Sequence, residues 1–215
     1  MNALKEIEKL LPQDIEKRSF EIIGEELEKL GVSLPKEEEL ITKRVIHTSA
    51  DFDYVKTLKY SKDAVEKAHE LLKAGAHIVT DTNMALAGIN KRALARLGGE
   101  AHCFMADEEV AKLAKERGTT RAAISMEKAR KIDKPVIFAI GNAPTALVQI
   151  YEMMKTSDWR PAFVIGVPVG FVNVEVSKEL IMETDIPYIV NAGRKGGSNV
   201  AAAICNALMY EITER

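Results

Sequence analysis

Short, almost wholly apolar segments alternate with amphipathic helical segments from residue 61 onward, and this alternation strongly limits the fold. The apolar segments are HIVTD, AHCFM, PVIFAI, AFVIGV and PYIVNA, and each precedes a stretch with helical spacing. Strands that are apolar at nearly every residue are buried on both faces, as in parallel sheets covered by helices. We therefore predict an α/β fold: a three-layer α/β/α, Rossmann-like domain with a mainly parallel sheet of about five strands.

The first fifty residues are predicted to form a helical N-terminal segment. Phe20, Ile23 and Leu27 recur at helical spacing, and Gly31 follows where a helix would stop. A second helix is expected after Pro35, where KEEELITKRVIH carries acids in its first turn and bases near its end, as the helix dipole favours. This segment is the one candidate for a separate subdomain.

Length and charge exclude several classes of protein. A chain of 215 residues fits one compact domain, so residues 1–215 are predicted to be a single domain. Thirty basic and 32 acidic residues give a net charge of −2, which favours neither nucleic acid nor a membrane surface as partner. The charged segment MNALKEIEKLLPQDIEKRS argues against a signal peptide or membrane span, so we predict a cytoplasmic protein. Cys103 and Cys205 fit buried thiols.

Four segments follow predicted strands and are the places to look for a ligand: TDTNMA, GNAPTA, GVPVGFVN and NAGRKGGSN. In open parallel sheets, ligands bind beyond the carboxyl ends of the strands. In GNAPTA, Gly141 allows a sharp turn and Pro144 suits the first helical turn, so free backbone N–H groups could receive an anion. A tight turn without a ligand explains the same residues equally well.

The segment NAGRKGGSN favours anion binding over a plain turn. Its three glycines permit close backbone approach, while Arg194 and Lys195 supply positive charge and Ser198 is expected to cap the next helix. The spacing does not match a P-loop, because the lysine precedes the paired glycines, and no GxGxxG occurs in the sequence. A nucleotide cofactor is therefore not supported.

Four histidines occur, and His47 is the strongest candidate for chemistry. His69, His77 and His102 have no partner at metal-ligand spacing, so structural roles are favoured for them. Spacing alone favours a structural role for His47 also, as a helix-end side chain bonded to the last carbonyls. Imidazole, however, titrates near physiological pH, and Arg44 one turn earlier could hold an anionic group against it.

Five segments together resemble the precorrin-8X methylmutase family, including its cobalt-precorrin-8 counterpart. They are RVIHTSADFDY, TDTNMALAGI, AIGNAPTAL, GVPVGFVNVEVSKE and NAGRKGGSNVAAA, and they run in family order from about residue 16 to 206. The resemblance implies an isomerase of vitamin B12 biosynthesis that moves a methyl group from C-11 to C-12 of a corrin-type macrocycle, giving hydrogenobyrinic or cobyrinic acid. It also implies a homodimer with a corrinoid substrate, and neither a cofactor nor a bound metal.

The same resemblance implies roles for individual residues. His47 would donate a proton as the methyl group migrates in a 1,5-shift, and general acid catalysis contributes about 10²- to 10⁴-fold. Other positions would bind the acetate and propionate carboxylates of the substrate, for which guanidinium groups are well suited. The implied binding residues are Arg18, Ser19, Arg44, Arg121, Asn142, Arg194 and Lys195. A solvated surface charge is the alternative for each arginine.

Two other functions remain as alternatives at this point. A noncatalytic tetrapyrrole carrier could use the same carboxylate-binding turns without needing His47 for chemistry. A nucleotide-dependent Rossmann enzyme is disfavoured by the missing glycine motif. The segment Asp81, Thr82 and Asn83 falls at a family position of variable composition, so it is given no role.

Overall fold

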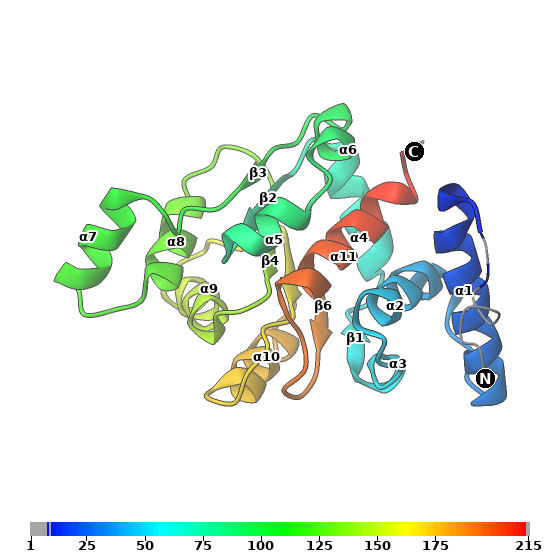
Figure 1. Ribbon diagram of the computed structural model, residues 1–215. Coiled ribbons are helices and arrows are strands. Elements are labelled where there is room, and N and C mark those ends of the chain that lie inside the picture. Colours follow the sequence, from blue (N-terminus) through cyan, green and yellow to red (C-terminus); the bar gives the residue numbers. More distant parts are fainter. Residues whose placement is uncertain (1–7, 9, 214–215) are drawn as a thin grey trace.

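A six-stranded sheet forms the centre of the computed structural model, which describes residue 8 and residues 10–213. The strand order is β1-β6-β5-β4-β2-β3; β1 is antiparallel to β6, and all other neighbouring strands are parallel. The predicted mainly parallel sheet is thus confirmed (Figure 1). The strands are β1 (Leu58–Tyr60), β2 (His77–Thr80), β3 (Ala101–His102), β4 (Val136–Ile140), β5 (Phe163–Gly166) and β6 (Tyr188–Asn191).

Helices occupy most of the remaining described chain, and most follow a strand directly. None of the described helices combines the length and apolar character that crossing a membrane requires. The helices are α1 (Pro12–Lys29), α2 (Lys36–Ser49), α3 (Tyr54–Thr57), α4 (Ala64–Lys73), α5 (Asn83–Gly88), α6 (Lys91–Arg96), α7 (Glu108–Glu116), α8 (Arg121–Ala129), α9 (Pro144–Thr156), α10 (Val174–Met182) and α11 (Ser198–Tyr210).

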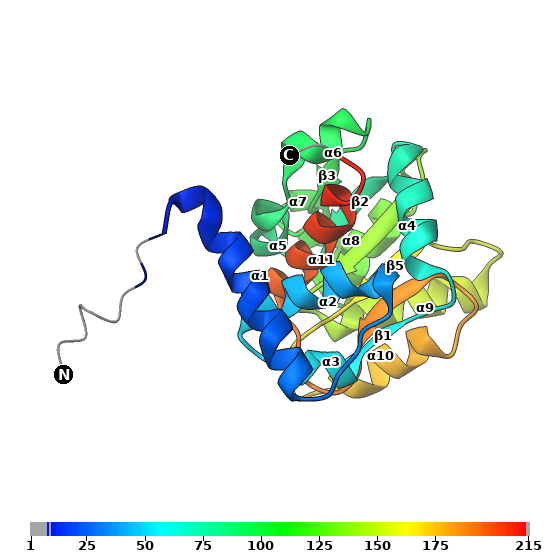
Figure 2. The same cartoon turned by 90° about the vertical axis from the view of Figure 1, so that its right-hand side faces the viewer.

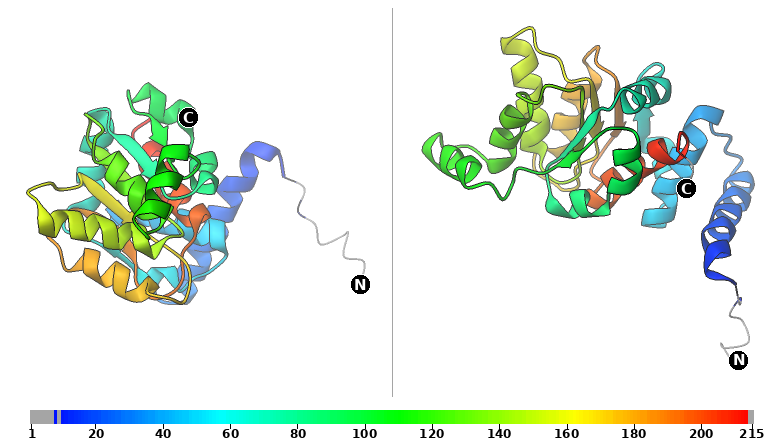
Figure 3. Two further views of the ribbon diagram at one scale, coloured as in Figure 1. Left: turned by 90° about the vertical axis from the view of Figure 1, so that its left-hand side faces the viewer. Right: turned by 90° about the horizontal axis from the view of Figure 1, so that it is seen from above.

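Side chains of the central strands alternate between two hydrophobic layers, as expected for strands buried on both faces. In β4, Ile137 and Ala139 pack in the layer formed with α2, α4 and α11. Phe138 and Ile140 point the other way, into the layer formed with α8, α9 and α10. The predicted three-layer α/β/α architecture is therefore confirmed, and Figure 3 shows the sheet between its two sets of helices.

The helical N-terminal segment is confirmed from Pro12 onward, while residues 1–7 and 9 of the prediction lie outside the described part of the chain. Helix α1 lies along the outside of the molecule against α2 (Figure 2), and it buries Ile23 and Leu27 there. Gly31 follows with a positive φ of 68°, which glycine adopts without steric cost. Helix α2 follows Pro35 and ends at Ser49, so His47 lies in its last turn.

The structure contains six strands where about five were predicted. The additional strand, β1, is only three residues long and contains the exposed Lys59, so it lacks the continuous apolar run of the buried strands. It lies at one edge of the sheet, where its solvent-facing side needs no apolar residues. The other edge strand, β3, is two residues long and therefore shorter than the segment AHCFM suggested.

Candidate functional site

The turn after β4 is held by a buried carboxylate from the exit of the neighbouring strand β2. Asp81 accepts N–H bonds from Gly141 and Asn142 at 2.8 Å each and from Ala143 at 2.5 Å. Burial raises the pKa of Asp81, and the three N–H donors oppose that shift. These N–H groups are therefore not free to receive a ligand anion, although the side chain of Asn142 is exposed.

The turns that follow the central strands pack against one another through backbone atoms. A Cβ added to Gly141 would lie 2.7 Å from Ser198 Cα, and one added to Gly196 would lie 2.1 Å from the carbonyl oxygen of Val167. Only glycine fits this close approach. Ser198 is the first residue of α11 and bonds to the Thr82 hydroxyl at 2.8 Å, so the prediction that its side chain caps the helix is wrong.

A buried lysine supports the turn between β6 and α11. Lys178 is fully buried on α10, and its ammonium group donates to the carbonyls of Gly193 at 2.6 Å and Lys195 at 2.9 Å. The side-chain amide of Asn191 donates to the same Lys195 carbonyl at 2.8 Å. Burial lowers the pKa of Lys178 to about 8. Polar groups beneath the turn thus fix the backbone that carries Arg194 and Lys195.

The two cationic side chains of this turn already have acidic partners. Arg194 Nε donates to Glu175 at 2.8 Å, and Lys195 Nζ donates to Asp51 and Asp53 at 2.6 Å each. The two aspartates raise the pKa of Lys195, so the amine stays charged. Because these pairs are exposed to water, each is a weak contact that solvent screens.

His47 is exposed to solvent near the carboxyl end of α2. Its ring lies 5.6 Å from the ring of Phe20 on α1, and its side chain makes no hydrogen bond or ion pair within residues 10–213. The end of α2 is instead closed by the N–H of Ala50, which donates to Ile46, and by the hydroxyl of Ser49, which donates to Val45. The interpretation of His47 as a group bonded to the last carbonyls is therefore wrong.

Arg44 points into the protein between aromatic rings. It pairs with Glu16 at 2.6 Å, and its guanidinium group stacks 5.2 Å from Phe20 and 5.1 Å from Tyr210, with only 11% of the side chain exposed. Arg44 and His47 thus both contact Phe20. Arg44 borders a cavity of about 320 Å³ that also includes Arg92 and Arg96 among its lining residues.

The two predicted residues of α1 lie beside this region. Arg18 is surrounded by carboxylates, with Glu8 at 3.3 Å, Glu25 at 3.5 Å and Glu21 at 3.6 Å. The Ser19 hydroxyl donates to the Ile15 carbonyl of the preceding turn at 3.0 Å. Arg44 and His47 of α2 both contact Phe20 of α1, whereas the described contact of Ser19 is within its own helix.

Arg121 is not brought to the same region. It is the first residue of α8, and its exposed side chain has no ion-pair partner in the described part of the chain. Figure 1 and the right-hand view of Figure 3 place α8 and α1 at opposite ends of the molecule. A single copy of the chain therefore does not place Arg121 beside His47.

Large apolar side chains are exposed where β2 and β5 end. Met84 is 72% exposed, Phe171 84% and Val172 78%, and the guanidinium group of Arg194 lies over the Phe171 ring at 5.8 Å. Large apolar side chains exposed at the carboxyl ends of parallel strands are candidates for ligand contact. These residues were not among those predicted from the sequence. The signal for them was the presence of large apolar residues inside the turn segments TDTNMA and GVPVGFVN.

Comparisons with known proteins all point to one family. The family model for precorrin-8X methylmutase matches residues 14–211. A cobalt-precorrin-8 methylmutase from Salmonella typhimurium is 44% identical, over 94% of this chain and 97% of the relative, and one from Priestia megaterium is 43% identical, over 92% and 87%. The solved structure of precorrin-8X methylmutase from Thermus thermophilus has a TM-score of 0.81 and 36% identity, covering 91% of this chain and 96% of that one.

Proposed function

The chain belongs to the precorrin-8X methylmutase family, and we propose from this premise that it moves a methyl group from C-11 to C-12 of precorrin-8 or cobalt-precorrin-8 in cobalamin biosynthesis. Such a methylmutase is an isomerase. The product is hydrogenobyrinic acid from the metal-free substrate, or cobyrinic acid from the cobalt form. The observation that carries the residue assignment is the exposed imidazole of His47, which forms no hydrogen bond with any described residue.

His47 acts as the proton donor in this proposal. A proton placed on the conjugated macrocycle makes the ring electron-poor and lowers the barrier to migration. The methyl group then leaves C-11 with its bonding electron pair and bonds to C-12. An isomerisation leaves the atom count of the substrate unchanged. The ring therefore releases one proton after the methyl group has moved, and the imidazole takes up a proton again. Solvent exposure of His47 supports this exchange.

The cationic residues bind the acetate and propionate groups of the substrate. Arg194 and Lys195 are fixed through the backbone by Lys178, and both have exposed acidic partners that a substrate carboxylate can replace. Arg18 has the same type of exposed carboxylate partners. Arg44, Ser19, Asn142 and Arg121 complete the proposed set, Arg44 from the cavity beside α1 and Asn142 from the turn after β4.

The apolar groups at the strand exits suit the faces of a large conjugated ring. Phe171 and Met84 are exposed in the unliganded chain, and covering them with a macrocycle would remove their apolar surface from water. The guanidinium of Arg194 above the Phe171 ring places a carboxylate-binding group at the edge of that surface. A corrin-type macrocycle, which is a flat apolar ring with charged substituents around its edge, matches this combination of apolar and cationic side chains.

The experiment is an anaerobic absorbance assay with precorrin-8 and, separately, cobalt-precorrin-8. Methyl migration changes the ring conjugation, so turnover is visible as a spectral change. We expect the native protein to convert at least one substrate, and the cobalt form more rapidly, because the Salmonella and Priestia relatives carry that substrate in their names. Failure to convert either substrate would overturn the proposal.

The variant His47→Ala tests the proton donor. It should lose about 10²- to 10⁴-fold in kcat while its affinity for the macrocycle changes little. His69→Gln is the matched control, because it removes a histidine from α4 and should keep native turnover. Native turnover in His47→Ala would remove His47 from the mechanism. Tight binding without conversion by the native protein would instead favour a tetrapyrrole carrier.

We further propose that the chain is one domain over residues 1–215 and works in the cytoplasm as a homodimer. The separation of α8 from α1 supports a shared site, since a second copy could bring its own Arg121 to the His47 region. Mixing Arg121→Ala and His47→Ala proteins, at a substrate concentration where each variant alone shows little turnover, tests this, because one of the two sites in each mixed dimer would be intact. About a quarter of native activity should return, and no recovery after subunit exchange would argue against sharing.

A further inference from the structure

Three potential metal ligands meet at the sheet edge formed by β2 and β3. The strands are parallel, with Ile78 paired to Ala101 and Val79 paired to His102. Side chains alternate between the two faces of a strand, so His77, Glu100 and His102 all point to one face. Their ligand atoms lie within 4.8 Å of one another. Spacing along the sequence did not reveal this group, because strand pairing brings the residues together.

The distances fit a common ion. His77 Nδ1 and His102 Nε2 lie 2.9 Å apart, and the His102 nitrogen lies 3.9 Å from Glu100 Oε2. Two nitrogens bound at about 2.0–2.1 Å with the tetrahedral angle that Zn²⁺ prefers would be about 3.3 Å apart, so the two imidazole nitrogens must part by about 0.4 Å when an ion replaces the hydrogen bond between them. The carboxylate must move about 1 Å closer to complete such a site, and it can do so because the Glu100 side chain is 72% exposed.

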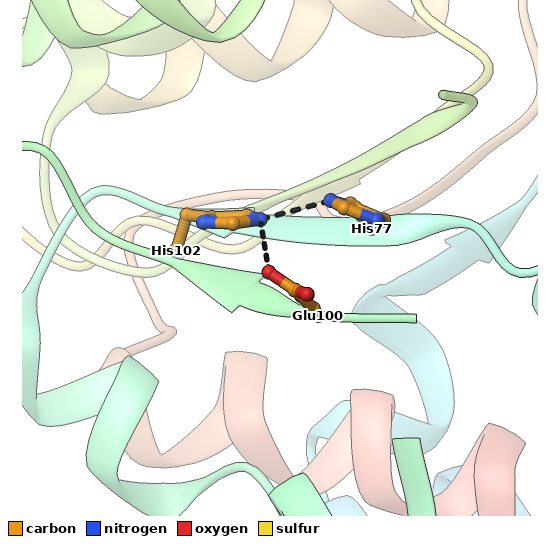
Figure 4. A group of neighbouring side chains, drawn as sticks. All are labelled: His77, Glu100 and His102. Atoms are coloured by element: carbon orange, nitrogen blue, oxygen red, sulfur yellow. Dashed lines mark hydrogen bonds and ion pairs between the residues drawn. The ribbon is translucent and has the colours of Figure 1, made fainter. Parts of the chain in front are cut away.

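The orientation of the side chains also favours a shared ligand. In Figure 4 the two imidazoles turn a nitrogen toward each other, and the Glu100 carboxylate approaches the same His102 nitrogen. The rings are stacked with centroids 5.0 Å apart, so the two imidazoles already lie side by side on this face of the sheet. A hydrogen bond between the imidazoles uses one nitrogen of each and leaves the carboxylate without a role. An ion uses all three groups.

We propose that His77, Glu100 and His102 form a binding site for a late first-row divalent cation of the zinc type. Two imidazole nitrogens and one carboxylate oxygen are ligands that Zn²⁺ accepts, and water would fill the remaining positions. The ion would fasten the two-residue strand β3 to β2, which has few ladder hydrogen bonds to hold it. The site lies at the beginning of β2, whereas Asp81 follows the other end of that strand.

The test is calorimetric titration of Zn²⁺ into protein freed of metal with a chelator, without any corrinoid present. The native protein should bind one equivalent, and its melting temperature should rise with Zn²⁺ concentration. Glu100→Gln should weaken binding about tenfold or more, and the double variant His77→Gln/His102→Gln should abolish it. Glu100 is exposed, so its substitution separates loss of a ligand from loss of folding.

The control variant is His69→Gln, which removes a histidine beside the acid Glu211 while leaving the β2–β3 edge intact. It should bind Zn²⁺ as the native protein does. Titration with Co²⁺ provides a second readout, because its visible ligand-field bands should appear in the native protein and not in the double variant. One-equivalent binding that persists in the double variant, or no binding by the native protein, would overturn the proposal.

Discussion

Lys195 Nζ donates to Asp51 at 2.6 Å, and this bond joins the turn after β6 to the loop that follows His47. The two segments are 144 residues apart in the chain. Helix α2 leads into the segment that contains Asp51, and β6 leads into the turn that contains Lys195. Because the pair is exposed, it positions the lysine at little energetic gain, and the lysine stays available to another carboxylate.

Neutralising the two aspartates should therefore increase substrate affinity. In Asp51→Asn/Asp53→Asn, Lys195 has no internal carboxylate to leave, so KM should fall by up to about fivefold, a small change because the ion pairs are exposed and weak. Lys195→Met should raise KM. Steady-state kinetics measures both changes, and an unchanged KM in both variants would exclude Lys195 from substrate binding.

The variant Asp81→Asn should destabilise the fold. An amide has one acceptor oxygen where the carboxylate has two, so at least one of the three buried N–H groups would lose its partner and the others would lose a charged acceptor. We expect the free energy of unfolding to fall by about 2–4 kcal/mol, measured with urea. Asp107→Asn is the control, because Asp107 pairs with Lys128 near the surface, and its cost should stay below about 1 kcal/mol.

Lys178 should make stability rise with pH in an alkaline window. Its pKa is about 8 in the folded protein and near 10.5 when unfolded, so between these values the unfolded chain binds more protons. The contribution of this group to the free energy of unfolding should increase by about 3 kcal/mol from pH 8 to 10.5. Comparing urea unfolding of the native protein and Lys178→Met across that range isolates the effect. Equal pH slopes for the two proteins would contradict the prediction.

Phe171→Ser should weaken substrate binding without weakening the fold. The side chain is 84% exposed, so its removal should change the free energy of unfolding by less than about 0.5 kcal/mol. Losing an aromatic contact with the macrocycle should raise the dissociation constant about tenfold, which spectral titration measures. Leu30→Ser, at another exposed apolar position just after α1, should leave affinity unchanged. Equal effects of the two substitutions would mean that Phe171 does not touch the substrate.

The architecture was predictable because its signals are local. Apolar runs such as PVIFAI can only be buried strands when helices separate them, and the structure has β4 at Val136–Ile140. The placement of His47 in the last turn of α2 was likewise visible in the helical spacing and the charges of that segment. Edge strand β1 was not predicted, because a short strand with one solvated side carries too few apolar residues to be recognised.

Partners from distant segments could not be predicted in the same way. Asp81 meets the GNAPTA turn only because β2 and β4 are neighbours in the sheet, an order that the sequence pattern leaves open. Asp51 and Asp53, which bind Lys195, lie 144 and 142 residues before it in the chain. Lys178 did carry a signal, since it shares a helix face with Val174 and Ile181, where a lysine among apolar residues requires buried acceptors.

The close contacts of Gly141 with Ser198, and of Gly196 with Val167, make the base of the candidate site a surface of main chain. A side chain at either glycine would collide with main-chain atoms of the neighbouring segment, so the fold itself sets the shape of this base. The proposed function therefore assigns substrate preference to exposed side chains at the strand exits, among them Phe171, Met84 and Arg194. Engineering of this enzyme toward other macrocycles should diversify those positions and leave both glycines untouched.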